Sequence, residues 1–209
     1  MSNLKELFTA TYTNKKWDEG GSLSGLGSSL DYTENIRKSL VEFIKKNKIK
    51  TIWDCSCGDW NWMKQIKNEL PNYVGNDIVD ELIETNIKNY ATNTIKFQCG
   101  DMLEELKLLT DSSIDLIICR HTLEHLPSSY AIDVVREIKR VGIWSMITSN
   151  TYSDNCELSV DGVVGRCINL ESEPYESLLG IPLQKYYDSI GTQTNDTFGM
   201  NLYKHNTIS

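Results

Sequence analysis

The sequence lacks the long apolar segments that export or membrane insertion requires. Its start, MSNLKELFTATYTNKKW, contains no apolar run of about seven residues, and no stretch approaches the roughly 20 apolar residues that span a bilayer. Positive charge is also scarce, because 21 lysines and arginines stand against 29 aspartates and glutamates, a net charge of −8. Such a surface repels phosphate backbones and anionic membranes. We therefore expect a cytoplasmic protein that binds neither nucleic acid nor a membrane.

The cysteine pattern lacks the features of a disulfide framework or a zinc site. Six cysteines are spread over 209 residues, and a chain of this length can build a core without disulfides. Cys55 and Cys57 form a close pair, but no second pair stands at zinc-binding spacing. We expect reduced cysteines and predict no metal site.

Helical and strand periodicities alternate through the middle of the chain. The apolar spacing predicts helices over 32–47, 62–70, 79–90 and 129–141, and strands over 50–54, 73–77, 94–98, 114–120 and 143–149, with a last strand over 197–203. Alternating strands and helices form right-handed crossover units. The fold class is therefore α/β, a doubly wound, mostly parallel sheet with helices on both faces.

The segments on either side of this alternation have a different composition. Residues 18–30, DEGGSLSGLGSSL, are rich in glycine and serine and predict a loop or lid. The length favours one domain over residues 1–209. Within it we assign 1–30 as an N-terminal arm, 31–149 as a ligand-binding core and 150–209 as a part that completes the site.

Ligands of such sheets bind beyond the carboxyl ends of the strands. The loop after the first predicted strand, DCSCGDW, holds one glycine, whereas a dinucleotide fingerprint needs three to admit a pyrophosphate. Asp77 ends the next predicted strand, where an acidic side chain accepts hydrogen bonds from a ribose diol. This pattern favours a nucleoside ligand without a pyrophosphate.

Four ordered motifs resemble those of the class I S-adenosylmethionine-dependent methyltransferases. The matching stretches are IWDCSCGDW, YVGNDI, FQCGDM and DLIICRHTLEHLP, all between residues 31 and 149. A narrower resemblance links Trp17–Ser29 and Cys57–Trp62 to small methyltransferases of bacterial capsule and viral glycan gene clusters. The family resemblance implies S-adenosylmethionine as the cofactor.

The resemblance also implies which residues bind the cofactor. Asp54 and Asp59 would attract its cationic groups, Asp77 would bind the ribose hydroxyls, and Asp101 would bind the adenine amino group. The full predicted set is Asp54, Cys57, Gly58, Asp59, Trp60, Asp77, Ile78, Asp101, Met102 and Arg120. Trp60 departs from the family pattern, because small residues are common there, and we expect it to narrow the room beside the methionine portion.

The segment Arg120–Pro127, RHTLEHLP, lies at the end of the fourth predicted strand and carries two of the three histidines. Methyl transfer to oxygen requires a positioned acceptor and removal of its proton, a task that histidine performs near neutral pH. His121 is the first candidate for the base, His125 the second, and Arg120 is a candidate for positioning the acceptor. Glu124 and His125 alternatively orient this loop by hydrogen bonding.

The acceptor is expected to be a glycan or another small molecule, such as a nucleotide sugar or a phosphate-bearing compound. Candidate acceptor-binding residues are Trp17, Ser24, Gly25, Asn150, Tyr152 and Arg166. Two alternatives stay open. One is a non-catalytic module that binds a nucleoside. The other is a zinc hydrolase that uses the H-x-x-E-H pattern, which Pro127 disfavours because it interrupts the required helix.

Overall fold

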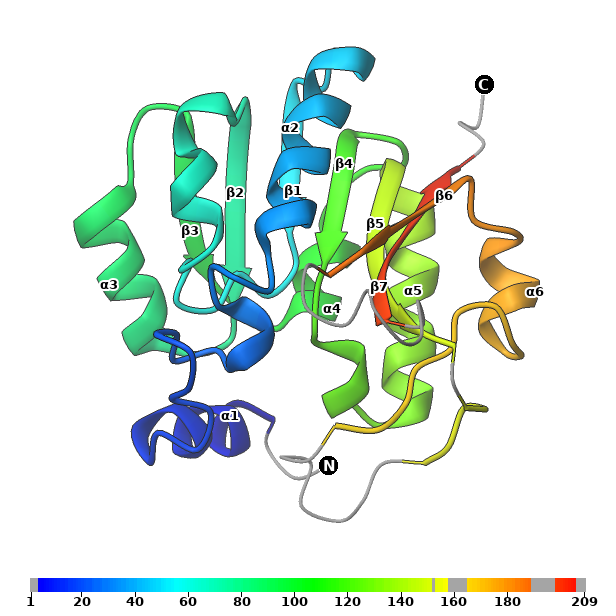
Figure 1. Cartoon of the computed structure of the whole chain (residues 1–209), viewed down its shortest axis with the longest axis horizontal. Helices are drawn as coiled ribbons and strands as arrows, with labels where there is room; N and C mark the ends of the chain where they lie inside the picture. Colours follow the sequence, from blue (N-terminus) through cyan, green and yellow to red (C-terminus); the bar gives the residue numbers. More distant parts are fainter. Residues whose placement is uncertain (1–3, 152, 158–164, 189–197, 206–209) are drawn as a thin grey trace.

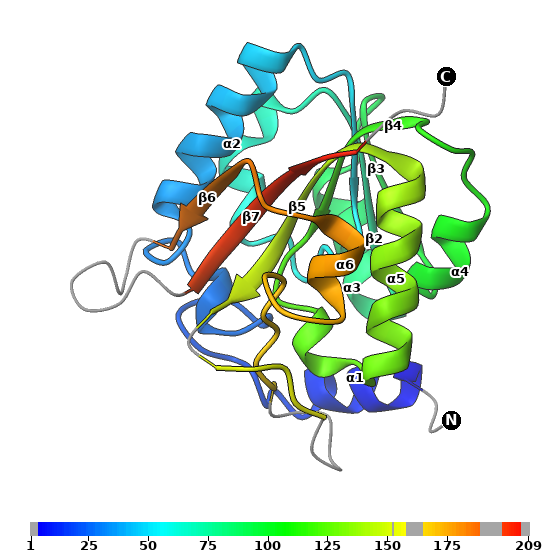
Figure 2. The same cartoon turned by 90° about the vertical axis from the view of Figure 1, so that its right-hand side faces the viewer.

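The computed structural model describes residues 4–151, 153–157, 165–188 and 198–205. Within these residues one seven-stranded sheet has the strand order β3-β2-β1-β4-β5-β7-β6 (Figures 1 and 2). Strands β1 to β5 are mutually parallel, whereas β7 runs antiparallel to both β5 and β6. The strands are β1 (Thr51–Asp54), β2 (Asn72–Asp77), β3 (Ile95–Cys99), β4 (Ile114–Cys119), β5 (Gly142–Asn150), β6 (Gln184–Tyr187) and β7 (Phe198–Lys204).

Helices pack on both faces of the sheet (Figure 2). One face is covered by α2 (Glu34–Asn47) and α3 (Asp80–Tyr90), which share a core with Ile52, Leu116 and Met146. The other face is covered by α4 (Met102–Lys107), α5 (Ser128–Val141) and α6 (Tyr175–Leu179), which pack on Trp53 and Ile117. Neighbouring strand residues therefore bury opposite faces, as in a sheet covered on both sides. None of the helices in the described residues is long and apolar enough to cross a membrane.

The predicted α/β fold is confirmed, and one predicted helix is wrong. The segment Met63–Glu69 forms 3-10 turns with a kink at Ile66 instead of a regular α-helix. The prediction also missed α1 (Leu4–Thr13), α4, α6 and β6. The last predicted strand corresponds to β7, and its first residue, at position 197, lies outside the described residues.

The parallel strands place their carboxyl ends along one edge of the sheet. Helix α1 and the following segment cross beneath this edge in the view of Figure 1. Strand β6 contributes to the same edge, because two successive antiparallel pairings, β5 with β7 and β7 with β6, make it parallel to β5. The residues that follow β1, β2, β3, β4 and β6 therefore lie at one end of the sheet.

Candidate active site

A cavity of about 240 Å³ lies at this end of the sheet, between the loops that follow β1 to β4 and the N-terminal segment. It brings together most of the residues predicted from the sequence. Those that line it are Trp17, Ser24, Gly25, Asp54, Cys57, Gly58, Asp77, Ile78, Asp101, Met102, Arg120, His121 and His125. Asp59, Trp60, Asn150 and Arg166 do not line it, and Tyr152 lies outside the described residues.

The glycine loop after β1 is held in place by buried hydrogen bonds. Gly58 has a φ of 54°, in the left-handed region, and its N–H donates to the Asp77 carboxylate at 2.9 Å. Asn86 of α3 donates to the carbonyl of Gly58 at 2.8 Å. Burial raises the pKa of Asp77, although hydrogen bonds from backbone N–H groups oppose this. The loop and the end of β2 therefore form one rigid wall of the cavity.

Asp54 ends β1 beneath this loop and accepts a hydrogen bond from the Tyr73 hydroxyl at 2.7 Å. Its side chain is buried, and burial raises the pKa of Asp54 to about 7. A carboxylate desolvated in this way gains most from a cationic ligand, which restores the charge balance that water would have supplied.

Asp59 and Trp60 do not have the positions that we expected. The Asp59 carboxylate accepts hydrogen bonds from Leu23 N–H at 2.8 Å and from the Ser22 hydroxyl, so it ties down the N-terminal segment. The Trp60 ring is fully buried in the core and packs against Tyr73, Tyr90 and Phe97. Trp60 therefore takes no room from the cavity.

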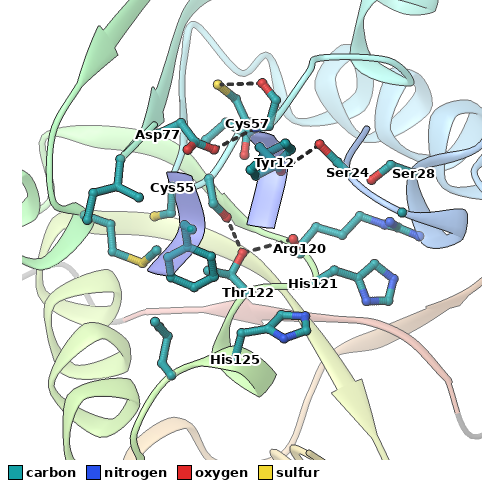
Figure 3. Close-up of a pocket in the computed structure, with 18 of the residues that line it drawn as sticks. Tyr12, Ser24, Ser28, Cys55, Cys57, Asp77, Arg120, His121, Thr122 and His125 are labelled. Carbon is teal, nitrogen blue, oxygen red and sulfur yellow. Dashed lines mark hydrogen bonds between the residues drawn. The ribbon is translucent and has the colours of Figure 1, made fainter. Parts of the chain in front are cut away.

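The N-terminal segment reaches the glycine loop through two hydroxyl groups (Figure 3). Tyr12 Oη lies 2.9 Å from Ser24 Oγ, and Ser24 Oγ accepts a hydrogen bond from Asp59 N–H at 3.0 Å. Leu4, Phe8 and Tyr12 of α1 all line the cavity, and the sequence prediction missed them. The signal was present, because apolar side chains at spacings of four and eight form one helical stripe.

Asp101, after β3, and Tyr130 of α5 close one edge of the cavity. Asp101 caps α4, accepting hydrogen bonds from Leu103 N–H at 3.0 Å and Glu104 N–H at 3.3 Å. The Tyr130 hydroxyl of α5 also donates to Asp101, and burial raises the pKa of Tyr130. Tyr130 is a further lining residue that the sequence prediction missed.

His121 and His125 lie across the cavity from Asp77, after the end of β4 (Figure 3). His121 has a left-handed φ of 52°, and its Nδ1 lies 2.8 Å from Glu124 Oε1. Burial and Arg120 lower the pKa of His121, but the carboxylates of Asp188 and Glu124 outweigh them, so the net shift is upward. The ring of His125 packs against Trp17 with ring centroids 4.8 Å apart.

Arg120 and Arg166 are both committed to contacts within the protein. Arg120 donates to the Gly27 carbonyl at 2.6 Å and pairs with Asp188 at 2.7 Å. Arg166 donates to the carbonyls of Cys156 and Leu126, at 2.7 and 2.9 Å, and so holds the C-terminal part against the loop before α5.

The local structure does not suit the zinc alternative. Leu123–His125 is a single 3-10 turn, and the left-handed residue at His121 prevents one helix from carrying both histidines. In the described ranges no three histidine, cysteine, aspartate or glutamate side chains are grouped to hold a metal ion.

Comparisons with known proteins agree with the observed fold. Residues 53–143 match a sequence-family model described as a methyltransferase domain. The magnesium protoporphyrin IX methyltransferase from Synechocystis PCC 6803, solved with bound S-adenosylmethionine, has a TM-score of 0.61 and 13% identity over 97% of this chain and 95% of its own. The PH0226 protein from Pyrococcus horikoshii OT3 has a TM-score of 0.62 and 14% identity over 83% and 89%.

A methyltransferase from Archaeoglobus fulgidus shares 17% identity at a TM-score of 0.44, and the match spans 58% of this chain and 57% of that relative's length. A search of curated proteins finds no match.

The chain therefore has the fold of S-adenosylmethionine-dependent methyltransferases, and its residues 53–143 match a methyltransferase domain. S-adenosylmethionine is accordingly the cofactor of this class of site.

Proposed function

We propose that the chain methylates an oxygen atom of a sugar or of a sugar-derived small molecule. The observation that carries this proposal is the pairing of His121 Nδ1, whose ring lines the cavity, with Glu124 Oε1 at 2.8 Å. A carboxylate bound to one ring nitrogen fixes the orientation of an imidazole and leaves the other nitrogen to accept a proton. The sequence candidate His121 therefore remains the proposed base, and Glu124 orients it.

The cavity offers suitable groups for the ammonium, ribose and adenine parts of the cofactor. Asp54 suits the ammonium group, Asp77 the ribose hydroxyls and Asp101 the adenine amino group. Met102 and Tyr130 supply apolar surface for the adenine ring. When bound there, S-adenosylmethionine supplies an electrophilic methyl group and leaves as S-adenosylhomocysteine.

The residues around the histidines support a neutral, hydroxyl-bearing acceptor. Arg120 is already neutralised by Asp188, so it offers no unpaired charge to an anionic group. Trp17 lines the cavity beside His125, and an aromatic ring of this kind can pack on the apolar face of a sugar. As the acceptor oxygen bonds to the methyl carbon, its proton passes to His121 Nε2, which must be neutral beforehand. Since the pKa of His121 is raised, we expect turnover to increase with pH above about 6.5, its ordinary value.

Calorimetry and a transfer assay test this proposal in two steps. S-adenosylhomocysteine should bind the wild type, and Asp77→Ala should weaken binding by more than about tenfold, the value of one or two charged hydrogen bonds. A panel of nucleotide sugars and glycans should then accept a labelled methyl group.

Substitution of the proposed base gives the sharpest result. His121→Ala should lower turnover at least about a hundredfold while leaving S-adenosylhomocysteine affinity nearly unchanged. The matched control is His205→Gln, because His205 bonds Ser145 in the first half of β5, away from the cavity. Full turnover in His121→Ala would transfer the role of base to His125. Tight cofactor binding without transfer to any acceptor would favour a non-catalytic nucleoside-binding module.

A further inference from the structure

Four charged or titratable side chains form a buried cluster beside the cavity. Arg120 and His121 follow β4, Glu124 lies in the next turn, and Asp188 follows β6. The exposed fractions of the Arg120 and Asp188 side chains are 4% and 3%, and Arg120 Nη2 lies 2.7 Å from Asp188 Oδ1. Asp188 Oδ2 lies 3.8 Å from His121 Nε2. The same cluster thus joins residues that are 68 positions apart in the chain.

This cluster is not an efficient way to stabilise the fold. Taking an ion pair out of water costs free energy, and this cost is recovered only when every remaining polar atom is hydrogen-bonded. Within the described residues, Arg120 Nε, Glu124 Oε2 and Asp188 Oδ2 are buried without a hydrogen-bond partner. Incompletely satisfied charges of this kind concentrate at functional sites.

The sheet topology explains how Asp188 reaches the cluster. Strand β6 is parallel to β5 through the intervening β7, so its carboxyl end lies at the same edge as the cavity. Asp188 is the first residue after β6. The C-terminal part of the chain therefore delivers a carboxylate to the end of β4.

We propose that Asp188 is a positioning residue of the transfer site, because its carboxylate neutralises Arg120 and faces the imidazole of His121. This inference rests on the proposed role of His121 as the base. A guanidinium next to a buried imidazole disfavours the protonated ring, and such a ring is a poor proton acceptor. Asp188 opposes this effect, together with Glu124, so that His121 can accept a proton beside a permanent cation.

The other groups around His121 do not replace this carboxylate. Glu124 bonds Nδ1 on the opposite side of the ring. From β5, Thr148 accepts a hydrogen bond from His121 N–H at 2.9 Å, and from the N-terminal segment the ring meets Gly27, so neither element adds a charge. The positive charge beside His121 is that of Arg120, the preceding residue, and its guanidinium is bonded to Asp188.

Titration of His121 by NMR tests the proposal without any methyl acceptor. The ring signals are assigned with His121→Gln, and the pKa of His121 is measured in the wild type, Asp188→Asn and Asp111→Asn. Asp188→Asn should lower the pKa of His121 by about one unit or more, the usual effect of a close opposite charge. Asp111→Asn is the matched control, since Asp111 also pairs with an arginine, Arg140, but lies before β4 and away from the cavity.

Further measurements separate a positioning role from a structural one. Asp188→Asn should bind S-adenosylhomocysteine within about twofold of the wild type, because Asp188 does not line the cavity. Asp188→Glu, which keeps the charge, should retain most of the wild-type pKa of His121. An unchanged pKa in a folded Asp188→Asn variant overturns the proposal. If that variant does not fold, a wild-type His121 that titrates at or below its ordinary value overturns it equally. Both results are independent of whether an acceptor is found.

Discussion

The N-terminal segment packs tightly against Gly58 of the glycine loop, and the substitution Gly58→Ala tests that contact. Gly58 has a φ of 54°, which costs a residue with a side chain about 1–2 kcal/mol. An added Cβ would lie 2.3 Å from Ser24 Oγ and 3.3 Å from Tyr12 Oη, so Ser24 must move. Movement of Ser24 breaks its hydrogen bonds to Tyr12 and to Asp59 N–H, each worth about 1 kcal/mol.

These contributions amount to a loss of roughly 3–4 kcal/mol, or a fall in Tm of about 6–16 °C for a chain of this size. Thermal unfolding measures it, and Gly21→Ala is the matched control. Gly21 also has a positive φ, 78°, but no atom lies within 4 Å of its added Cβ, so only the backbone strain applies. Gly58→Ala combined with Ser24→Gly should recover part of the loss caused by the clash. The reasoning is refuted if Gly58→Ala and Gly21→Ala melt at the same temperature.

Two other predictions concern the carboxylates that line the cavity. Burial raises the pKa of Asp54 to about 7, so the group is mostly neutral at pH 6 and mostly anionic at pH 8. If the Asp54 anion binds the ammonium group, S-adenosylhomocysteine should bind about tenfold more tightly at pH 8 than at pH 6. The affinity for 5′-methylthioadenosine, which lacks that group, should not change in this way. Calorimetry that shows equal pH dependence for the two compounds would exclude Asp54 from the cofactor site. Asp101→Asn should leave the Tm nearly unchanged, because asparagine caps helices as well as aspartate, yet should weaken S-adenosylhomocysteine binding about fivefold. A lower Tm with unaltered affinity would mean that Asp101 serves only as a cap.

The alternation of strands and helices was predictable because each crossover unit buries its own apolar pattern. Ile36, Leu40 and Phe43 lie on the buried stripe of α2, and Leu116 to Ile118 form a strand that is buried on both faces. The segment 63–69 was predicted as a helix from the same kind of spacing. Apolar spacing reports which side chains are buried, and a kinked 3-10 segment can bury them as well.

The site was predictable in the parts that are local in sequence. Asp54 and Asp77 are the last residues of β1 and β2, and Gly58 lies in the loop after β1, so the positions of the strands fix the positions of these residues. Tyr130 and Tyr12 project from helices, and their participation depends on how those helices pack. Trp60 was placed in the cavity by motif position, whereas its large apolar ring gains more from full burial in the core.

Asp188 shows why the C-terminal third could not be interpreted without the fold. A single carboxylate in a polar stretch carries no sequence signal, and its contact with Arg120 spans 68 positions. Its location follows only once β7 is known to reverse direction between β5 and β6, since one antiparallel pairing fewer would send Asp188 to the far end of the sheet. Arg120 also holds Gly27 of the N-terminal segment. The two regions outside the predicted core therefore meet at one guanidinium. Substitutions at Gly27 and Asp188 should affect the pKa of His121 non-additively in an NMR titration, because a Cβ at position 27 would lie 2.9 Å from His121 Nε2, the atom that Asp188 also faces.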